Sequence, residues 1–363
     1  MLFLPLYPET MPSSRLRVYQ YVPFLQALGM KVTVIPALPE PWFSRLYYSR
    51  SKWAHFFQYA SEFLNSISRA LRSRNYDVVF IQKGLLLSNI RGMERLFAHS
   101  GSRLIFDLDD RVYGTNIMEF DWPILRMMQD PDQAGKLSQR CRAVVAGNPY
   151  LGDLARKYNR NVFVIPTPVD TDRLVPSENS SPAASRSEIV VGWAGMASTA
   201  LTYFSLVADA LREISRRYPI RLRLLTRLHG RKFHLDGVKV EVVDWSYENE
   251  AREMQRFDLA IAPLQDDDWS RGKCSFRVLT YMSTGIPTVA SRAGANCEML
   301  EDGADGFLAD DTEEWVNKLS RLIEDKDLRR RMGAAARKKV VERYSVKKMA
   351  VSVADIIKQV SLS

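Results

Sequence analysis

A stretch in the last third of the chain, DDDWSRGKCSFRVLTYMSTGIP, combines residue types that bind anions. Gly272, Lys273 and Ser275 stand just before an apolar helical pattern that Gly285 and Pro287 terminate. Ser275 is a good N-cap, and the first backbone N–H groups of a helix have no partner within it. Together with the helix dipole and the mobile charge of Lys273, these groups favour a phosphate or diphosphate. The alternative is an ordinary loop that enters a buried helix.

Two polar clusters follow apolar segments in the first half of the chain. They comprise Ser13, Ser14, Arg15 and Arg17 after Leu2–Leu6, and Asp107, Asp109 and Asp110 at the end of Arg103–Asp107. If these segments are parallel strands, both clusters lie outside the carboxyl ends, where open sheets bind ligands. Three carboxylates within four positions repel one another, which favours a general base, a substrate anchor or an ion site at Asp109 and Asp110. The alternative is a set of turn residues.

A third loop, AGMASTA, follows the apolar segment Ile189–Trp193 and contributes Gly195, Ser198 and Thr199. Small residues that open a helix suit a diphosphate, although Ser198 and Thr199 are also ordinary N-cap residues. The four histidines and three cysteines show no metal-ligand spacing, so the sequence predicts no metal and no catalytic histidine.

The elements that would position these residues alternate between short apolar runs and helical patterns, which predicts βαβ units and parallel sheets. The candidate strands are Leu2–Leu6, Lys31–Ile35, Asp77–Gln82, Arg103–Asp107, Ala143–Ala146 and Val162–Ile165, then Ile189–Trp193, Arg221–Leu225, Val238–Val243, Leu259–Ala262 and Pro287–Ala290. The candidate helices include Arg15–Leu28, Leu87–His99, Tyr150–Tyr158, Thr199–Arg217, Tyr247–Gln255, Thr312–Glu324, Asp327–Tyr344 and Val346–Val360. We therefore predict an α/β protein.

Length and composition divide this series into two domains. The chain has 363 residues, and the segment 175–188 is rich in Ser, Pro and Ala, as interdomain linkers are. We predict a first domain over 1–174 with an insertion at 39–75, a second domain over 189–345, and a final helix over 346–363 that crosses back to the first.

The charge is uneven, with 22 Lys and Arg against 15 Asp and Glu in residues 1–174 and a net charge of +9 for the chain. An excess of this sign favours anionic partners, but the basic residues are scattered and match no nucleic-acid-binding module. The beginning, MLFLPLYPET, has no basic region and is interrupted by prolines, so it predicts a strand and no signal peptide. With unpaired cysteines and no apolar run of about 18 residues, we expect a cytoplasmic protein.

The insertion at 39–75 carries seven aromatic residues within Trp42–Phe57 and six lysine or arginine residues. Such a segment can lie in a membrane interface, which would place the protein at the inner face of the membrane with an anionic surface as partner. The alternative, which helices of soluble proteins favour, is that the aromatics pack on their own domain.

The second half resembles the donor-binding domain of retaining glycosyltransferases of the GT-B fold, family 4 (glycosyl transferases group 1). The motifs that carry the resemblance are VVGWAGMAST, DLAIAPL, GKCSFRVLTYMSTGIPTVAS and CEMLEDGADGFL. In the first half, RAVVAGNPYLGDLARKY and VFVIPTPVDTDRL resemble the last unit of that family's first domain. The resemblance implies two Rossmann-like parallel-sheet domains that face one another across a cleft.

The resemblance also implies a function and a set of site residues. The function is transfer of a sugar from a nucleotide-diphosphate-sugar to a hydroxyl of a glycan or lipid-linked glycan, with retained anomeric configuration and without a metal or cofactor. The implied catalytic residues are Lys273, Asp109 and Asp110; the implied donor-binding residues are Gly195, Ser198, Thr199, Arg227, Trp245, Asp266, Lys273, Cys274, Ser275, Phe276 and Thr280; and Ser13, Ser14, Arg15, Arg17 and Asp107 lie on the acceptor side.

The sequence departs from the family at several of these positions. The Glu-x7-Glu pair of the family falls, by register, on Gly272 and Thr280, and neither can act as a carboxylate. Ser198 and Thr199 stand where the family has the Arg and Lys that bind the donor diphosphate, so Lys273 or Arg227 is expected to supply the charge. The alternatives to a transferase are a sugar-nucleotide epimerase or hydrolase on the same fold, or a non-catalytic nucleotide-sugar-binding protein.

Overall fold

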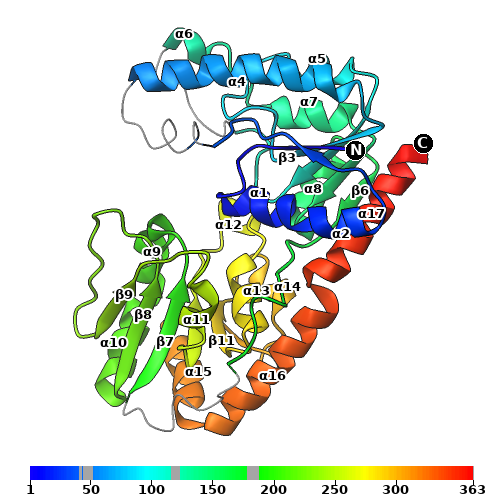
Figure 1. Cartoon of the computed structure of the whole chain (residues 1–363). Helices are drawn as coiled ribbons and strands as arrows, with labels where there is room; N and C mark the ends of the chain where they lie inside the picture. The colour runs from blue at the N-terminus through cyan, green and yellow to red at the C-terminus, as the bar shows by residue number, and fades with distance from the viewer. Residues whose placement is uncertain (41–42, 44–51, 116–122, 178–187, 363) are drawn as a thin grey trace. The chain divides into compact units, whose positions relative to one another are not determined.

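The computed structural model describes residues 1–40, 43, 52–115, 123–177 and 188–362, which form two units (Figure 1). Unit 1 comprises Met1–Pro168, Gly272–Cys274 and Val346–Ser363. Unit 2 comprises Val169–Arg271 and Ser275–Ser345. The short stretch Gly272–Cys274 therefore belongs to unit 1, although the residues on both sides of it belong to unit 2.

Unit 1 contains a six-stranded parallel sheet with the order β2-β1-β3-β4-β5-β6. Its strands are β1 (Leu2–Pro5), β2 (Thr33–Val34), β3 (Val78–Gln82), β4 (Arg103–Leu108), β5 (Ala143–Ala146) and β6 (Val162–Val164). All residues of β1, β3 and β5 are buried because helices cover both faces of the sheet. Each of the six predicted strands is confirmed, with ends that shift by at most two residues.

The helices of unit 1 divide between the two faces of this sheet. One hydrophobic cluster joins β-strand residues to η1, α2 and α17 on one side. Another joins them to α4, α5, α7 and α8. The bounds are α1 (Pro12–Arg17), η1 (Tyr19–Tyr21), α2 (Val22–Ala27), α4 (Lys52–Ser73), α5 (Met93–Ala98), α6 (Pro123–Arg126), α7 (Gln133–Arg140), α8 (Pro149–Arg156) and α17 (Val346–Leu362). The last helix thus completes the core of unit 1.

Unit 2 contains a second six-stranded parallel sheet, with the order β12-β11-β10-β7-β8-β9. Its strands are β7 (Ile189–Ala194), β8 (Ile220–Leu225), β9 (Val240–Val243), β10 (Leu259–Ala262), β11 (Thr288–Ser291) and β12 (Phe307–Ala309). The five predicted strands are confirmed, and β12 is a sixth that the sequence did not predict.

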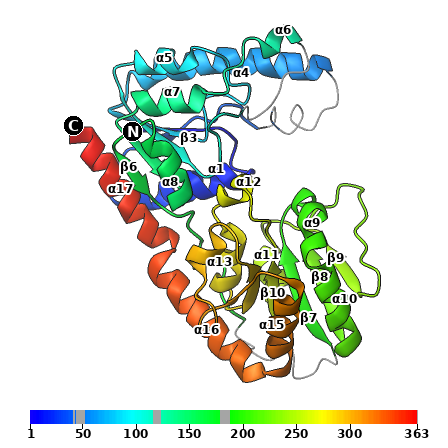
Figure 2. The same cartoon turned by 180° about the vertical axis from the view of Figure 1, so that it is seen from behind.

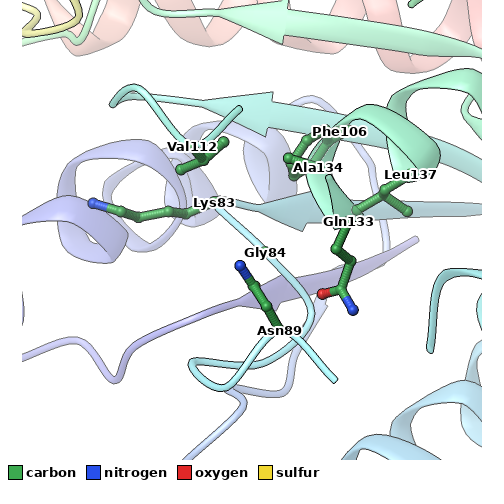
Figure 3. A pocket seen from close by; sticks show the side chains of 8 residues that line it. All are labelled: Lys83, Gly84, Asn89, Phe106, Val112, Gln133, Ala134 and Leu137. Atoms are coloured by element: carbon green, nitrogen blue, oxygen red, sulfur yellow. The ribbon is translucent and has the colours of Figure 1, made fainter. Parts of the chain in front are cut away.

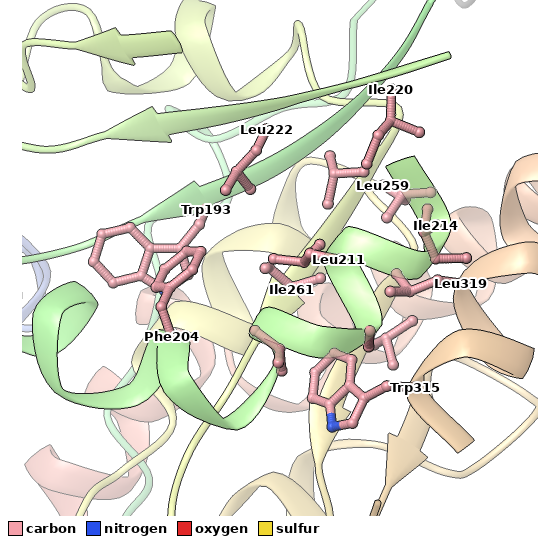
Figure 4. Close-up of a cluster of buried hydrophobic side chains, with 14 of the residues drawn as sticks. Trp193, Phe204, Leu211, Ile214, Ile220, Leu222, Leu259, Ile261, Trp315 and Leu319 are labelled. Atoms are coloured by element: carbon pink, nitrogen blue, oxygen red, sulfur yellow. The ribbon is translucent and has the colours of Figure 1, made fainter. Parts of the chain in front are cut away.

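Helices also cover the sheet of unit 2. They are α9 (Ala197–Tyr203), η3 (Phe204–Leu206), α10 (Ala208–Arg217), α11 (Glu250–Met254), α12 (Asp268–Arg271), α13 (Phe276–Ser283), α14 (Asn296–Met299), α15 (Thr312–Glu324) and α16 (Lys326–Arg343). Figure 4 shows side chains of β7, β8 and β10 meeting those of α10 and α15, with Trp193 and Trp315 as the largest members. Burying large apolar side chains of this kind stabilises the unit by roughly 1.5–3 kcal/mol each.

Three long helices predicted from the sequence are wrong in their continuity. The segment predicted as Thr199–Arg217 is divided into α9, η3 and α10. The segment predicted as Arg15–Leu28 is divided into α1, η1 and α2, because Pro23 has no N–H and crowds the preceding turn. The segment predicted as Leu87–His99 is helical only from Met93, since Gly92 before it has a positive φ of 88°. Within the described ranges, no helix is long and apolar enough to span a membrane.

Candidate functional site

Serine, glutamine and aspartate side chains meet at the carboxyl ends of β1, β3 and β4 in unit 1. The Ser13 hydroxyl donates a short hydrogen bond to Asp109 Oδ2, and Gln82 Nε2 donates to Asp109 Oδ1 at 3.2 Å and to Ser13 Oγ at 2.8 Å. Ser14 Oγ donates to Gln82 Oε1 at 2.7 Å. The structure therefore brings Ser13, Ser14 and Asp109 together as the strand-end rule predicts, and Gln82 connects them.

Arg17 and Asp107 are also brought together, but they are buried, each with 1 % of its side chain exposed. Arg17 Nε donates to Asp107 Oδ2 at 3.1 Å, and its Nη1 donates to the Ile165 carbonyl at 2.7 Å. Burial alone would lower the pKa of Arg17, but the carboxylate of Asp107 raises it above its ordinary value. Its Nη2 also donates to Asp107 Oδ1, so the buried guanidinium holds α1 against β4 and is almost inaccessible to a substrate. Arg15 is half-buried and donates to the Thr10 carbonyl.

Asp110 lies between two lysines. Its carboxylate oxygens are each 3.0 Å from Lys273 Nζ, and Oδ2 is 3.3 Å from Lys83 Nζ. The exposed fractions of the Asp110, Lys83 and Lys273 side chains are 15 %, 14 % and 35 %, so Lys273 is the most accessible of the three. The end of β4 therefore carries two lysines beside the two carboxylates of Asp109 and Asp110.

Lys83 is a site residue that sequence reasoning missed. It has a φ of 68°, which is uncommon for a side chain other than glycine, and its backbone N–H donates to the Asp107 carbonyl at 2.8 Å. Burial would lower the pKa of Lys83, but attraction to Asp109 and Asp110 raises it. Burial would likewise raise the pKa of Asp109, but Lys83, the Ser13 hydroxyl, Arg17 and Lys273 lower it. Both groups are therefore charged at neutral pH.

The cavity beside Lys83 is too small to hold a substrate. Its volume is about 10 Å³, roughly the space of one water. It is lined by Lys83, Gly84, Asn89, Phe106, Val112, Gln133, Ala134 and Leu137. Figure 3 shows the Lys83 ammonium pointing away from Gln133 and Leu137, which leaves the ammonium on the side of Asp110.

The stretch Gly272–Cys274 is held in unit 1 by several specific contacts. Asn148, which caps α8 by accepting from Leu151 N, also donates to the Lys273 carbonyl at 2.9 Å. Cys274 is buried, its Sγ lies 3.2 Å from the Asp109 carbonyl, and burial raises its pKa to about 12. Cys274 is therefore a neutral packing residue next to Lys273, and the donor-binding role expected for it stays a prediction.

Replacing Gly147 by alanine should disturb this seating. A Cβ at Gly147 would lie 2.4 Å from Cys274 Sγ, so the chain must shift, at a cost of about 1–3 kcal/mol in the free energy of unfolding. Denaturant unfolding of Gly147→Ala measures this cost. Because the clash is with the sulfur, the double variant Gly147→Ala/Cys274→Gly should be less destabilised than the two single changes predict. Strict additivity would show that Cys274 does not pack there.

In unit 2, an arginine lies against the loop that follows β7. Arg277 Nε donates to the Ala194 carbonyl at 2.6 Å, the guanidinium lies 4.7 Å from the centre of the Trp193 ring, and a Cβ at Gly195 would lie 2.6 Å from Arg277 Nη2. Burial lowers the pKa of Arg277, with partial compensation from Tyr281 and Tyr203. It makes no ion pair within the part of the chain that the structure describes.

A half-buried guanidinium without a carboxylate is poised to bind an anion. Arg277 lies at the carboxyl end of β7, beside Gly195, where the sequence predicts that a diphosphate binds. The sequence-based expectation was that Lys273 or Arg227 supplies the positive charge there. Its only sequence signal was an arginine in the first turn of the predicted helix α13. Arg227 itself is exposed, and its Nε donates to the Trp245 carbonyl at 2.6 Å.

The other residues predicted to bind the donor show mixed placements. Ser275 stands at the N-cap of α13 with a φ of 46°, but its hydroxyl donates to Asn296 Oδ1 and makes no cap, which corrects the expected cap. Thr280 Oγ1 donates to the Arg277 carbonyl of its own helix. Ser198 and Thr199 are not N-caps, since Met196 holds that position.

Three further residues that were predicted to bind the donor contact other groups than Arg277. They are Asp266, Trp245 and Phe276. Asp266 pairs with Arg271 through two hydrogen bonds of 2.9 Å. Trp245 Nε1 donates to Glu250, and Trp245 and Phe276 both pack against the second hydrophobic core of unit 2. Among the described residues, no group of three or more His, Cys, Asp and Glu side chains is arranged to hold a metal ion.

Residues 188–325 match the family model described as glycosyl transferases group 1. A sulfoquinovosyl transferase, SQD2 of Arabidopsis thaliana, is 40% identical over 72 residues, which are 18% of this chain and 14% of that protein. The chain thus aligns with only a small part of this relative.

Solved structures resemble the chain over nearly its whole length. HepE from Anabaena in complex with UDP has a TM-score of 0.67 with 16% identity and covers 99% of both chains; the same protein was also solved with UDP-glucose. Sucrose-phosphate synthase from Thermosynechococcus elongatus has a TM-score of 0.65 with 13% identity, covering 99% of this chain and 98% of the other. The two six-stranded parallel sheets match GT-B glycosyltransferase structures, which confirms the predicted fold class.

Proposed function

We propose that this protein is a glycosyltransferase that moves a sugar from a nucleotide-diphosphate-sugar to a hydroxyl acceptor, with retention of the anomeric configuration. The observation that carries the proposal is Arg277, a half-buried cation without an ion-pair partner in the described residues, beside Gly195 in the domain that matches glycosyl transferases group 1. The binding of UDP and UDP-glucose by HepE, which shares the fold, supports a nucleotide-diphosphate-sugar as the donor.

In this reaction the protein acts mainly through electrostatic stabilisation and forms no covalent bond that the proposal requires. As the glycosidic bond of the donor breaks, negative charge grows on the leaving diphosphate. Arg277 and the N-terminal N–H groups of α9 would stabilise this charge more strongly in the transition state than in the ground state. We also propose that Lys273, which is paired with Asp110 in unit 1, binds the donor. No metal is required for this role, since cations of the protein supply the charge.

On the acceptor side we assign Asp109. Its carboxylate is ionised, oriented by Ser13 and Gln82, and lies at the carboxyl end of β4, where it would orient or deprotonate the attacking hydroxyl. We propose that the acceptor is a glycan or lipid-linked glycan. We also propose that the protein is cytoplasmic and lies at the inner face of a membrane. The basic charge of residues 1–174 supports an anionic surface nearby.

A thermal-shift screen of nucleotide-sugars tests the proposal most directly. The true donor should raise the Tm in proportion to the logarithm of its concentration over Kd, and incubation with glycan acceptors should then give a glycosylated product. Transfer to water alone, or an epimerised donor, would instead indicate a hydrolase or epimerase. Binding without turnover would indicate a non-catalytic protein, a second candidate favoured by Gly272 and Thr280, which leave the family's two carboxylate positions empty of acid.

Lys273→Ala should weaken donor binding and turnover by about 1.5–3 kcal/mol, the scale of a charge-assisted hydrogen bond. Isothermal titration with the donor and initial rates measure the two effects. Lys232→Ala, which removes an exposed lysine of unit 2, is the matched control and should leave both unchanged. If Lys273→Ala binds and turns over as the wild type does, the ammonium serves only to pair with Asp110.

A further inference from the structure

The helix α4 of unit 1 buries several polar side chains and exposes large apolar ones, which is the reverse of an ordinary surface helix. Its buried side includes Glu62, Ser66, Arg69 and Ser73, each with no exposed surface. Ser66 and Arg69 donate to the Leu85 carbonyl at 3.5 and 2.9 Å, and burial lowers the pKa of Arg69 to about 9 in spite of the attraction of Glu62. Burying these charges costs free energy, so the side that faces the domain is not the most apolar side of the helix.

The outward side of α4 carries the large apolar side chains instead. They are Trp53, Phe56, Phe57, Phe63, Leu64 and Leu71, exposed by 64, 41, 64, 36, 66 and 52 %. Steps of three, four and seven residues place them on one face of the helix. A soluble helix normally buries such a stripe, and a contiguous exposed one marks an interaction site.

Two exposed methionines follow α6. Met127 and Met128 are 77 % and 47 % exposed, and both views of the molecule place α6 beside one end of α4 (Figures 1 and 2). In the same views, no strand of unit 1 lies beyond α4, so this side of the helix is at the margin of the unit.

The expectation that the aromatics of the insertion pack on their own domain holds only in part. Phe43 is buried against Leu6, Tyr7 and neighbouring residues, and Tyr59 lies in the main core of the unit. Trp53, Phe56 and Phe57 face outward. Trp42 and residues 44–51, which include Tyr47, Tyr48, Arg45 and Arg50, lie outside the described residues.

The exposed charges that the structure describes on α4 and α5, and at the ends of these helices, are of one sign. Arg72 and Arg74 at the end of α4, and Arg91 and Arg95 at the start of α5, which contacts α4, are exposed. The only carboxylates of these two helices are Glu62 and Glu94, which are 0 % and 2 % exposed. The surface therefore offers cations and aromatic rings, and α4 and α5 turn no carboxylate toward solvent.

We propose that the outward face of α4, together with Met127 and Met128, docks in the plane of an anionic lipid bilayer. Inserted aromatic and apolar side chains suit the boundary between headgroups and acyl chains, and the arginines match anionic headgroups. A second copy of the chain fits less well, since it would bring the same cations to the contact with no exposed carboxylate of α4 or α5 to pair with them. The purpose of this docking, which is to hold the enzyme beside a lipid-linked acceptor, rests on the proposed function. The docking itself does not.

Flotation of the full-length protein with vesicles tests the docking surface without donor or acceptor. At low salt the wild type should float with vesicles that contain phosphatidylglycerol, less with phosphatidylcholine alone, and less again at high salt. Phe57→Ser with Leu64→Ser should lower the partition coefficient about tenfold or more through lost apolar burial. Arg72→Glu with Arg74→Glu should lower it about tenfold or more, on anionic vesicles only, since each basic residue contributes about a factor of five.

Two control variants match these changes elsewhere on unit 1. Leu28→Ser with Val351→Ser removes apolar side chains that are 48 % and 51 % exposed, and Arg140→Glu with Arg160→Glu reverses exposed charges. Both should float as the wild type does. The docking surface is refuted if the wild type stays in the soluble fraction, if the controls lose as much binding as the α4 variants, or if Phe57→Ser with Leu64→Ser instead dissolves a dimer seen by light scattering.

The outcome is separable from the proposed function. Each variant is checked for folding by circular dichroism and for a thermal shift with the donor nucleotide-sugar, which unit 2 is proposed to bind. A protein that floats but is stabilised by no nucleotide-sugar would refute the proposed function and leave the docking surface in place. A protein that binds and transfers but does not float would do the reverse.

Discussion

Arg277→Gln should lower kcat/KM about 10²- to 10³-fold, because it removes a preorganised donor from the place where charge develops on the leaving diphosphate. Glutamine keeps a planar polar group that can still donate to the Ala194 carbonyl, so the local fold should persist. Arg277→Lys should recover part of the activity, since it restores the charge without the two-pronged geometry. Steady-state rates, together with Tm values that confirm folding, measure these effects.

Arg227→Gln is the matched control for this result. Arg227 is also an arginine of unit 2, but it is exposed and is bound to Trp245 rather than to the loop after β7. Its replacement should change kcat/KM by less than about threefold, because an exposed cation is well screened by solvent. If Arg227→Gln had the larger effect, the diphosphate would bind there and the assignment of Arg277 would be wrong.

Asp109→Asn should lower kcat about a hundredfold while the Kd for the donor nucleotide changes little. Asparagine preserves the shape of the side chain and can accept from Ser13, but it can neither take a proton nor attract the hydroxyl of an acceptor strongly. Because the pKa of Asp109 is lowered from its ordinary value of about 3.9, the group stays ionised through neutral pH, and its titration should not appear in a rate profile between pH 5 and 8.

Asp110→Asn separates a chemical role of Asp109 from a merely electrostatic one. Both changes remove one negative charge near Lys83 and Lys273, but Asp110 is the carboxylate that contacts the two ammonium groups. If Asp109 acts on the acceptor, Asp110→Asn should cost turnover much less than Asp109→Asn does. Equal losses, or a parallel loss of nucleotide affinity, would mean that the two aspartates only position the lysines.

The fold was predictable where a local pattern decides it. Strands of covered parallel sheets appear as short apolar runs between helical patterns, and eleven strands were predicted in this way. β12 was missed because its three residues, FLA, are too few to form a pattern, and it is a strand only through its pairing with β11. Helix continuity failed at Pro23 and Gly92, where backbone chemistry overrides a favourable pattern of side chains.

The site was predictable in position more than in detail. The strand-end rule brought Ser13, Ser14 and Asp109 together, but it gave Arg17 the same role, although Arg17 is buried against Asp107. Lys83 and Arg277 were missed because their importance depends on tertiary surroundings. Lys83 depends on a positive φ, and Arg277 depends on the approach of α13 to the loop after β7. Neither property leaves a periodic trace in the sequence.

The place of α17 in unit 1 has a consequence for synthesis on the ribosome. The cluster that joins Phe3, Phe80 and Ile105 to Val353 and Ile357 is complete only when residues 346–362 have left the exit tunnel. Roughly 180 residues separate Pro168 from Val346, and at about 5–20 residues per second their translation takes on the order of ten to forty seconds. During that interval one face of the nascent first sheet lacks the part of its cover that α17 provides, and it is then a natural client for a cotranslational chaperone.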